Sequence, residues 1–136
     1  MIYIANDVES AGGKLGVHST LSIGAALVTP EKIAFDEYWE KGLVFYAELR
    51  PDSPIYDEEA MRVGCLHLTC LDMIKQKDPR FDATSPKFSP YDVLVLMREN
   101  CEVPMIAINR FASWIQRFRK GNHRIVVVTH TVFIHG

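Results

Sequence analysis

Residues 2–10 read IYIANDVES and lead directly into a glycine-rich segment, AGGKLG. The stretch alternates in a way typical of a β-strand, whose successive side chains point to opposite faces. Ile2 and Ile4 then share one face, whereas Asp7 and Glu9 project together from the other. The two carboxylates are therefore expected side by side at the end of a strand, where the glycines interrupt regular structure.

Further strand and helix patterns follow along the chain. Strands are expected at residues 2–8, 21–29, 43–49 and 124–129, helices at 57–63, 66–75, 90–100 and 104–120, and an exposed loop at 77–90. Short connections between the first three strands predict an antiparallel meander. The β-branched run at residues 125–128 predicts a strand buried on both faces of a sheet. This order of elements predicts an α/β fold with a mixed sheet flanked by helices.

Length and composition restrict the class of protein. The chain has 136 residues, 15 basic and 17 acidic side chains, a net charge of −2 and 48% hydrophobic residues. These values predict one globular domain and exclude disordered and low-complexity classes. A near-neutral chain also argues against a polybasic protein that binds nucleic acid by net charge alone. An enzyme that acts on nucleic acid through bound cations remains compatible with this charge.

The N-terminal residues and the cysteines indicate the expected compartment. The sequence starts without a basic segment and reaches an acid at Asp7, so no signal peptide is predicted, and its apolar runs are too short for a membrane span. Cys65, Cys70 and Cys101 are sparse and odd in number, which favours reduced thiols in a cytoplasmic protein. Cys65, His67 and Cys70 have zinc-like spacing without an obvious second pair, so ordinary half-buried cysteines are expected instead.

Asp7 and Glu9 are the first candidates for chemistry. Carboxylate oxygens at the end of a strand suit Mg²⁺ or Mn²⁺, which are hard cations held by a few acids together with water and substrate phosphate. The alternative is that both are solvated acids where the strand enters a loop.

The surrounding sequence resembles a known enzyme family. Residues 4–12 and 22–28 resemble the first motif of the DEDD 3′-to-5′ exonucleases, in which Asp-x-Glu-Ser ends one strand and Ile-Gly-Ala lies in the next. Residues 45–51 and 59–64 resemble the third strand and the short helix that follows it, and residues 111–115 resemble the helix before the fourth strand. The resemblance covers most of the chain in the right order.

This resemblance implies a ribonuclease H-like mixed sheet, with three antiparallel strands and then a parallel one, flanked by helices. It also implies two-metal hydrolysis of phosphodiester bonds at the 3′ ends of single-stranded DNA or RNA. Asp7 would bridge two Mg²⁺ or Mn²⁺ ions and Glu9 would hold one of them. Ser10 would lie near the terminal nucleotide; its alternative is an ordinary hydroxyl at the entry to a turn.

The last residues depart from the family's pattern. His130 matches a polar position of the second motif and is a candidate substrate-binding residue, but His135 stands where an aspartate is expected. Imidazole replaces a carboxylate poorly on Mg²⁺, so His135 is a metal ligand mainly if Mn²⁺ or a transition metal binds. The third motif, a His-x-x-x-x-Asp on a later helix, has no counterpart after the stretch that resembles the second motif. The expectation is one incomplete exonuclease domain whose C-terminal part is missing, with a homodimer suggested by relatives.

These departures leave other functions open. One alternative is a catalytically incomplete ribonuclease H-like domain that binds nucleic acid or another protein, and a weaker one is a metal-dependent phosphatase. His67 and His123 are general-base candidates, although a surface role is more typical of such histidines. Tyr38, Trp39 and Tyr46 offer stacking surfaces for bases, with core packing as the alternative.

Overall fold

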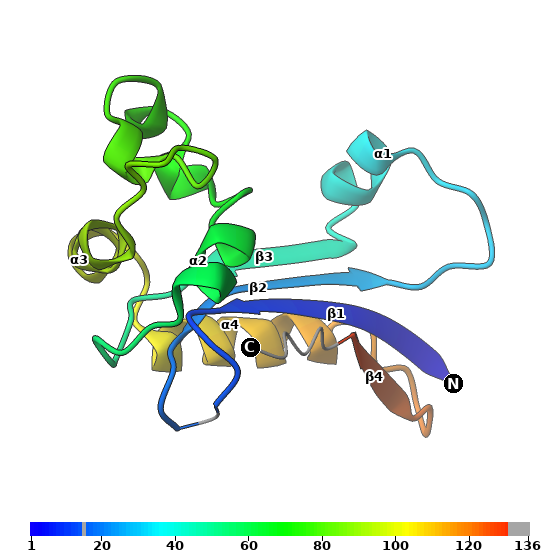
Figure 1. Ribbon diagram of the computed structural model, residues 1–136. Coiled ribbons are helices and arrows are strands. Elements are labelled where there is room, and N and C mark those ends of the chain that lie inside the picture. The colour runs from blue at the N-terminus through cyan, green and yellow to red at the C-terminus, as the bar shows by residue number, and fades with distance from the viewer. Residues whose placement is uncertain (15, 131–136) are drawn as a thin grey trace.

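The computed structural model describes residues 1–14 and 16–130 (Figure 1). Its strands and helices follow in the order β1 (Ile2–Ser10), β2 (Thr20–Leu27), α1 (Phe35–Glu40), β3 (Val44–Glu48), α2 (Glu58–Gly64), α3 (Pro90–Asn100), α4 (Pro104–Gln116) and β4 (Ile125–His130). Between α2 and α3 lie short 3-10 turns, namely η1 (Thr69–Leu71), η2 (Ile74–Gln76) and η3 (Pro79–Phe81).

Within the described residues the strands form a four-stranded sheet in the order β3-β2-β1-β4. β2 pairs antiparallel with both β1 and β3, and β4 pairs parallel with β1. An α/β fold with a mixed sheet, antiparallel through its first three strands and parallel at the fourth, is thereby confirmed. Because β1 and β4 run in the same direction and β3 is parallel to them, the C-terminal ends of these three strands lie at one end of the sheet.

Helix α4 covers one face of the sheet (Figure 1). The predicted alternation of β1 is confirmed, since Ile4 is fully buried in the cluster that α4 makes with the strands. Trp114 anchors this layer: its ring packs against Phe45 of β3, and its indole nitrogen donates to the carbonyl of Gly42 at 2.9 Å. Burial of such a large ring stabilises the layer, while the hydrogen bond satisfies its polar atom.

A second apolar cluster joins α2, α3 and the 3-10 turns to the end of the sheet. In Figure 1, α2 and the 3-10 turns are green and α3 is olive-yellow. Leu21 at the start of β2 packs there with Met61 of α2 and with Leu94 and Met97 of α3. The opposite faces of α2 and α3 carry the polar residues of these helices. This cluster positions α2 beside the end of β1.

The predicted starts of α2 and α3 are confirmed by their caps. Asp57 accepts a hydrogen bond from the backbone N–H of Ala60 at 3.1 Å, and Ser89 accepts one from Asp92 at 3.3 Å. Each cap satisfies an N–H group that the first helical turn leaves without a partner. Pro90 occupies the first turn of α3, where a proline's missing N–H is no loss.

Two predictions about local structure were wrong, and one helix was not predicted. Residues 66–75 do not form one helix, because Leu68 and Leu71 are drawn into the apolar cluster and leave separate 3-10 turns. The predicted exposed loop at 77–90 buries Phe81 and Phe88. Helix α1 was not predicted, since six residues are too few to show a helical period.

The prediction that the fourth strand is buried on both faces was also wrong. Val127 is 41% exposed and Val128 is 54% exposed in β4. In the part of the sheet that the structure describes, β4 is an edge strand whose only paired neighbour is β1. The β-branched composition therefore reflects strand propensity more than burial.

Among the described residues, no helix is long and apolar enough to cross a membrane.

Candidate functional site

Asp7 and Glu9 share one face of β1, as predicted, and this face is opposite the one that α4 covers. In the pairing of the strands, Asp7 is opposite Gly24 of β2, which in turn is opposite Tyr46 of β3. Glu9 is opposite Ser22, and Ser22 is opposite Glu48 in the same way. Two parallel rows of side chains thus cross one face of the sheet near the C-terminal ends of β1 and β3.

A pocket of about 190 Å³ opens over these rows. Its floor is the sheet, with Asp7 and Glu9 beside the small residues of β2, and α2 with the segment after it forms the facing wall. The residues that line it are Asp7, Glu9, Ser22, Gly24, Tyr46, Val63, Gly64, His67 and Leu68. The structure therefore brings both predicted acids into one concave site.

Gly64 allows α2 to approach the acids closely. A Cβ atom at this position would lie 3.3 Å from the carbonyl oxygen of Ser10 and 3.6 Å from Oε2 of Glu9. The first distance is tighter than ordinary van der Waals contact. The absence of a side chain at Gly64 thus lets the helix backbone close the pocket over Glu9.

The Glu9 carboxyl group is destabilised in its charged form. Partial burial raises its pKa above the ordinary value, and the neighbouring charge of Asp7 raises it further, while His67 acts in the opposite direction. Burial and a like charge both disfavour a carboxylate. A bound cation would relieve both effects, so this pair of acids fits the hard divalent ion that their oxygen donors suggest.

Tyr46 and His67 complete the site beside the acids. The Tyr46 hydroxyl donates a hydrogen bond to Glu48. Burial raises the pKa of Tyr46 well above its usual range, and this hydrogen bond raises it further. The hydroxyl is therefore a fixed donor. His67 lies on the pocket wall, where it is close enough to influence the charge of Glu9.

The other two candidate stacking aromatics lie away from these acids. Trp39 is exposed on α1 and makes an edge-on contact with Phe35, at 6.0 Å between ring centroids. The Tyr38 hydroxyl shares a hydrogen bond of 2.7 Å with Thr29. Of the three aromatics, Tyr46 is the one that lines the pocket.

The remaining predicted site residues have different positions. The hydroxyl of Ser10 donates to the carbonyl of Gly12 at 3.0 Å, across the turn that follows β1. His130 is opposite Asp7 in the pairing of β4 with β1, so its backbone lies beside the site. His135 lies outside the described residues. His123 follows α4 in an exposed turn far along the chain from the pocket residues.

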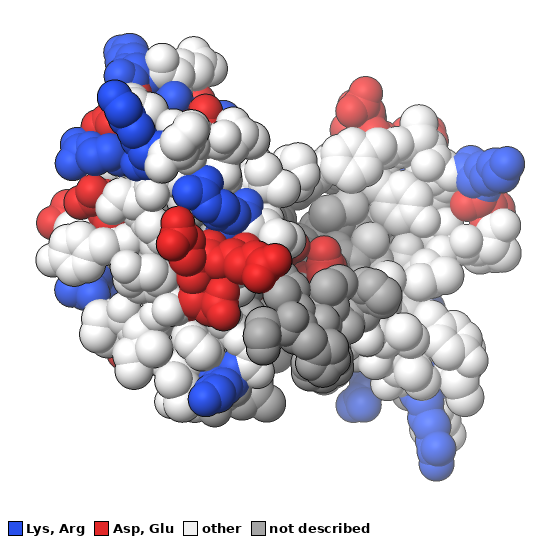
Figure 2. Space-filling model, viewed as in Figure 1, with Lys and Arg blue, Asp and Glu red and all other residues white. Residues whose placement is uncertain are grey.

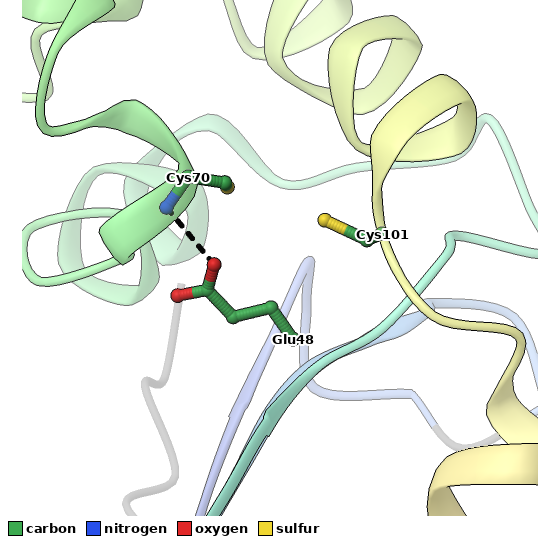
Figure 3. A group of neighbouring side chains, drawn as sticks. All are labelled: Glu48, Cys70 and Cys101. Carbon is green, nitrogen blue, oxygen red and sulfur yellow. Dashed lines mark hydrogen bonds between the residues drawn. The ribbon is translucent and has the colours of Figure 1, made fainter.

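A second group of potential metal ligands lies next to the pocket (Figure 3). One ligand atom from each of Glu48, Cys70 and Cys101 falls within 4.8 Å of the others. Cys65 is not in this group; it is buried in the apolar cluster, which raises the pKa of its thiol to about 12. The zinc-like spacing of Cys65 with Cys70 therefore does not correspond to a cluster in the fold.

Sequence reasoning missed Glu48 and Cys101. Glu48 follows Tyr46 with the same two-residue spacing as Asp7 and Glu9, and this signal would have placed it on one strand face with Tyr46. Cys101 gave no such signal, because tertiary packing brings it in from outside the strands. Tyr46 and His67 were candidates from the sequence, and both line the pocket.

Charge is unevenly distributed over the surface. Acidic side chains gather over α2, whose first turn follows Asp57 and carries Glu58 and Glu59 (Figure 2). Lys and Arg side chains gather at the end of the molecule where the 3-10 turns lie (Figure 2). Acidic side chains also lie at that end, where Lys75 pairs with Asp72 and Arg80 pairs with Asp78.

Comparison with known proteins adds no family assignment: no protein-family model matches the chain, and no curated protein matches it significantly.

Proposed function

We propose that this chain is a metal-dependent 3′-to-5′ exonuclease domain that hydrolyses phosphodiester bonds in single-stranded nucleic acid. The observation that carries the proposal is the placement of Asp7 and Glu9 in one pocket at the C-terminal end of β1. The strand order β3-β2-β1-β4, with β4 parallel to β1, also supports the ribonuclease H-like arrangement that the sequence resemblance implies.

Each side chain has a separate task in this proposal. Asp7 is exposed and meets substrate and solvent, while Glu9 is held under α2 beside Gly64. These two acids would hold Mg²⁺ or Mn²⁺, which polarises the phosphate, activates water and stabilises the leaving oxygen when bound. Gly24 keeps the floor between Asp7 and Tyr46 open. Tyr46 supplies an aromatic wall on which a terminal base can stack.

His67 is the proton acceptor that best fits the pocket. It lines the same pocket as the two acids, from the segment after α2. Histidine is suited to this task because its ordinary pKa lies near neutrality. The assignment is tested by measuring the cleavage rate against pH for wild type and His67→Gln. The wild-type rate should fall on the acid side of the profile, and this acid limb should be absent from His67→Gln.

Cleavage of 5′-labelled single-stranded DNA and RNA tests the proposal directly. With Mg²⁺ or Mn²⁺, the folded chain should produce a ladder that shortens from the 3′ end. Asp7→Asn and Glu9→Gln should each abolish the ladder, because each removes a charged ligand. Asp57→Asn is the matched control: it changes a nearby surface acid, keeps a side chain that caps α2 and should leave the ladder intact. Folded protein that gives no ladder with either substrate contradicts the proposal.

One observation favours a second candidate function, a non-cleaving nucleic-acid-binding or protein-interaction domain. His135 stands where the resemblance expects a metal-binding aspartate. Fluorescence anisotropy with a labelled single strand distinguishes the two. Binding that persists in Asp7→Ala, from a parent protein that never cleaves, supports the binding domain and rejects the enzyme.

A further inference from the structure

The carboxylate of Glu48 and the thiols of Cys70 and Cys101 converge from three separate segments (Figure 3). Glu48 ends β3, Cys70 lies in η1, and Cys101 directly follows α3. Their ligand atoms lie within 4.8 Å of one another, and each residue is partly accessible. An ion that enters this space would contact all three groups after small side-chain movements.

Backbone hydrogen bonds hold the segments of Glu48 and Cys101 together. The N–H of Glu102 donates to the carbonyl of Glu48 at 3.1 Å, and the N–H of Arg50 donates to the carbonyl of Glu102 at 2.7 Å. This short parallel bridge fixes Cys101 beside the end of β3. Cys101 is also tied to α3, because its N–H donates to the carbonyl of Met97 at 2.9 Å. The backbone therefore sets the positions of these two ligands.

Glu48 is oriented as metal-binding carboxylates are. Its Oε2 accepts the N–H of Thr69 at 2.6 Å and the hydroxyl of Tyr46, and its Oε1 accepts the N–H of Cys70 at 2.9 Å. An ionised carboxylate offers about four acceptor positions, so one position on Oε1 remains beside the two sulfur atoms. Outer hydrogen bonds of this kind fix a ligand's orientation before a metal binds.

The two cysteines supply the soft part of the ligand set. Both are free and partly exposed, and their sulfur atoms lie within reach of one ion. The thiolate is the form that binds metals, and a bound cation favours it at each thiol that it contacts. Two sulfur atoms and one carboxylate oxygen suit borderline-soft Zn²⁺ and are unsuitable for Mg²⁺.

We propose that Glu48, Cys70 and Cys101 bind a Zn²⁺ ion, with water as the fourth ligand. The ion would join η1 to the end of α3 and thereby stabilise the wall of the pocket that His67 and Leu68 form. This proposal goes beyond the exonuclease function and does not depend on it, because the zinc ligands are different residues from Asp7 and Glu9.

Cobalt substitution under anaerobic, reducing conditions tests the site, because Co²⁺ takes the place of Zn²⁺ and is coloured. The full chain with Co²⁺ should show thiolate-to-metal charge-transfer bands together with the visible bands of tetrahedral Co²⁺, and Zn²⁺ should displace both. Cys70→Ser and Cys101→Ser should each reduce the charge-transfer intensity by roughly half, and the double variant should abolish it. Cys65→Ala is the matched control, and it should retain the full spectrum.

Tyr46→Phe provides a second, more selective measurement. It removes the hydroxyl that donates to Glu48 and leaves all three ligands in place. Loss of such an outer hydrogen bond should weaken Zn²⁺ binding by about 10- to 100-fold in a competition titration. Circular dichroism of each variant establishes that it is folded.

Three results would overturn the proposal. The first is a folded, reduced wild-type chain without charge-transfer bands. The second is a spectrum that survives in the Cys70→Ser, Cys101→Ser double variant. The third is a disulfide between the two cysteines that persists under reducing conditions, detected by mass spectrometry, since a disulfide-bonded pair has no thiolate to offer a metal.

Discussion

Glu9 is the residue at which charge and packing conflict in the pocket. Its carboxyl group is covered by α2 through Gly64 and lies near Asp7, and both effects raise its pKa. A side chain in this position weakens the metal-free fold when it is ionised. Such a conflict is typical of functional sites, where groups are arranged for a ligand and not for stability.

Glu9→Gln should therefore stabilise the metal-free chain at pH 7. Because the folded-state pKa of Glu9 lies above its ordinary value of 4.5, the folded state binds the proton more tightly than the unfolded state. The stability that this group contributes is fully present below pH 4.5 and is lost as pH rises through the folded-state pKa. Thermal denaturation in EDTA should show a melting temperature a few degrees above wild type at pH 7, with the difference closing below pH 4.5.

Glu59→Gln is the control for this experiment, because it removes an exposed acid from the first turn of α2. It should leave the melting temperature unchanged or slightly lower, since acids there interact favourably with the helix dipole. A Glu9→Gln protein that is less stable than wild type at pH 7 contradicts the electrostatic argument.

Gly24→Ala separates folding from function. A Cβ atom at Gly24 would lie 3.8 Å from the carbonyl oxygen of Asp7 and 3.9 Å from the Tyr46 ring, which are ordinary contacts. The fold should tolerate the methyl group, but the methyl group occupies the pocket floor between these residues. We expect an unchanged or higher melting temperature and a loss of roughly 100-fold in cleavage rate, as for a substrate misplaced by about 1 Å.

Gly13→Ala is the matched control for this substitution, because a Cβ atom there would have no neighbour within 4 Å. It should change neither the melting temperature nor the cleavage rate. Full cleavage activity in Gly24→Ala would show that substrate does not use this part of the pocket.

At the scale of elements, the contact between α2 and β1 determines the shape of the pocket. Gly64→Ala should strain this contact, since its Cβ atom would be 3.3 Å from the Ser10 carbonyl oxygen, which belongs to backbone. Alanine improves helix propensity by about 1 kcal/mol, whereas overpacking costs about 1–3 kcal/mol. We expect the free energy of unfolding, measured by urea denaturation, to fall by about 1 kcal/mol. We also expect Mn²⁺ to raise the melting temperature of this variant less than that of wild type.

Ala60→Gly is the comparison within the same helix. It should cost about 1 kcal/mol through helix propensity alone and leave the response to Mn²⁺ as in wild type. If Gly64→Ala is more stable than wild type and responds normally to Mn²⁺, then α2 can move away from β1 without affecting the acids.

Local sequence rules predicted the elements whose stability is local. The alternation in β1 assigned Ile4 and Asp7 to opposite faces, and the helix expected at residues 90–100 is found as α3 (Pro90–Asn100). The 3-10 turns after α2 were not predicted, because their conformation depends on burial of Leu71 in a cluster built from distant segments.

The same distinction applies to the two candidate sites. Asp7 and Glu9 were predicted together because strand periodicity alone places them on one face. His67 enters the pocket through the packing of α2, and Cys101 reaches Glu48 through the backbone bridge at Glu102. Neither contact has a sequence spacing that short-range patterns can detect.

For the whole molecule, the described residues contain two apolar clusters that share the sheet. Leu21 and Ile23 are two residues apart on β2, yet Leu21 belongs to the cluster with α2 and α3, and Ile23 belongs to the cluster with α4. Strand β2 is also hydrogen-bonded on both sides, to β1 and β3. Loss of either cluster therefore removes support from the strand on which the other depends.

We expect the two clusters to unfold in one cooperative transition. A variant with Trp39→Phe, Cys70→Ser and Cys101→Ser keeps one of the 2 tryptophans, Trp114, and one of the 3 cysteines, Cys65. Trp114 then reports the α4 cluster by fluorescence, and Cys65, 3% exposed, reports the other by its reaction with a brief pulse of thiol reagent. In a metal-free urea titration the two signals should share one midpoint, because two-state unfolding is normal for a chain of this size. If Cys65 becomes reactive at a lower urea concentration than the one at which Trp114 fluorescence changes, then α2, α3 and the 3-10 turns open as a separate unit. The pocket wall that carries His67 would then be the first part of the candidate site to be lost.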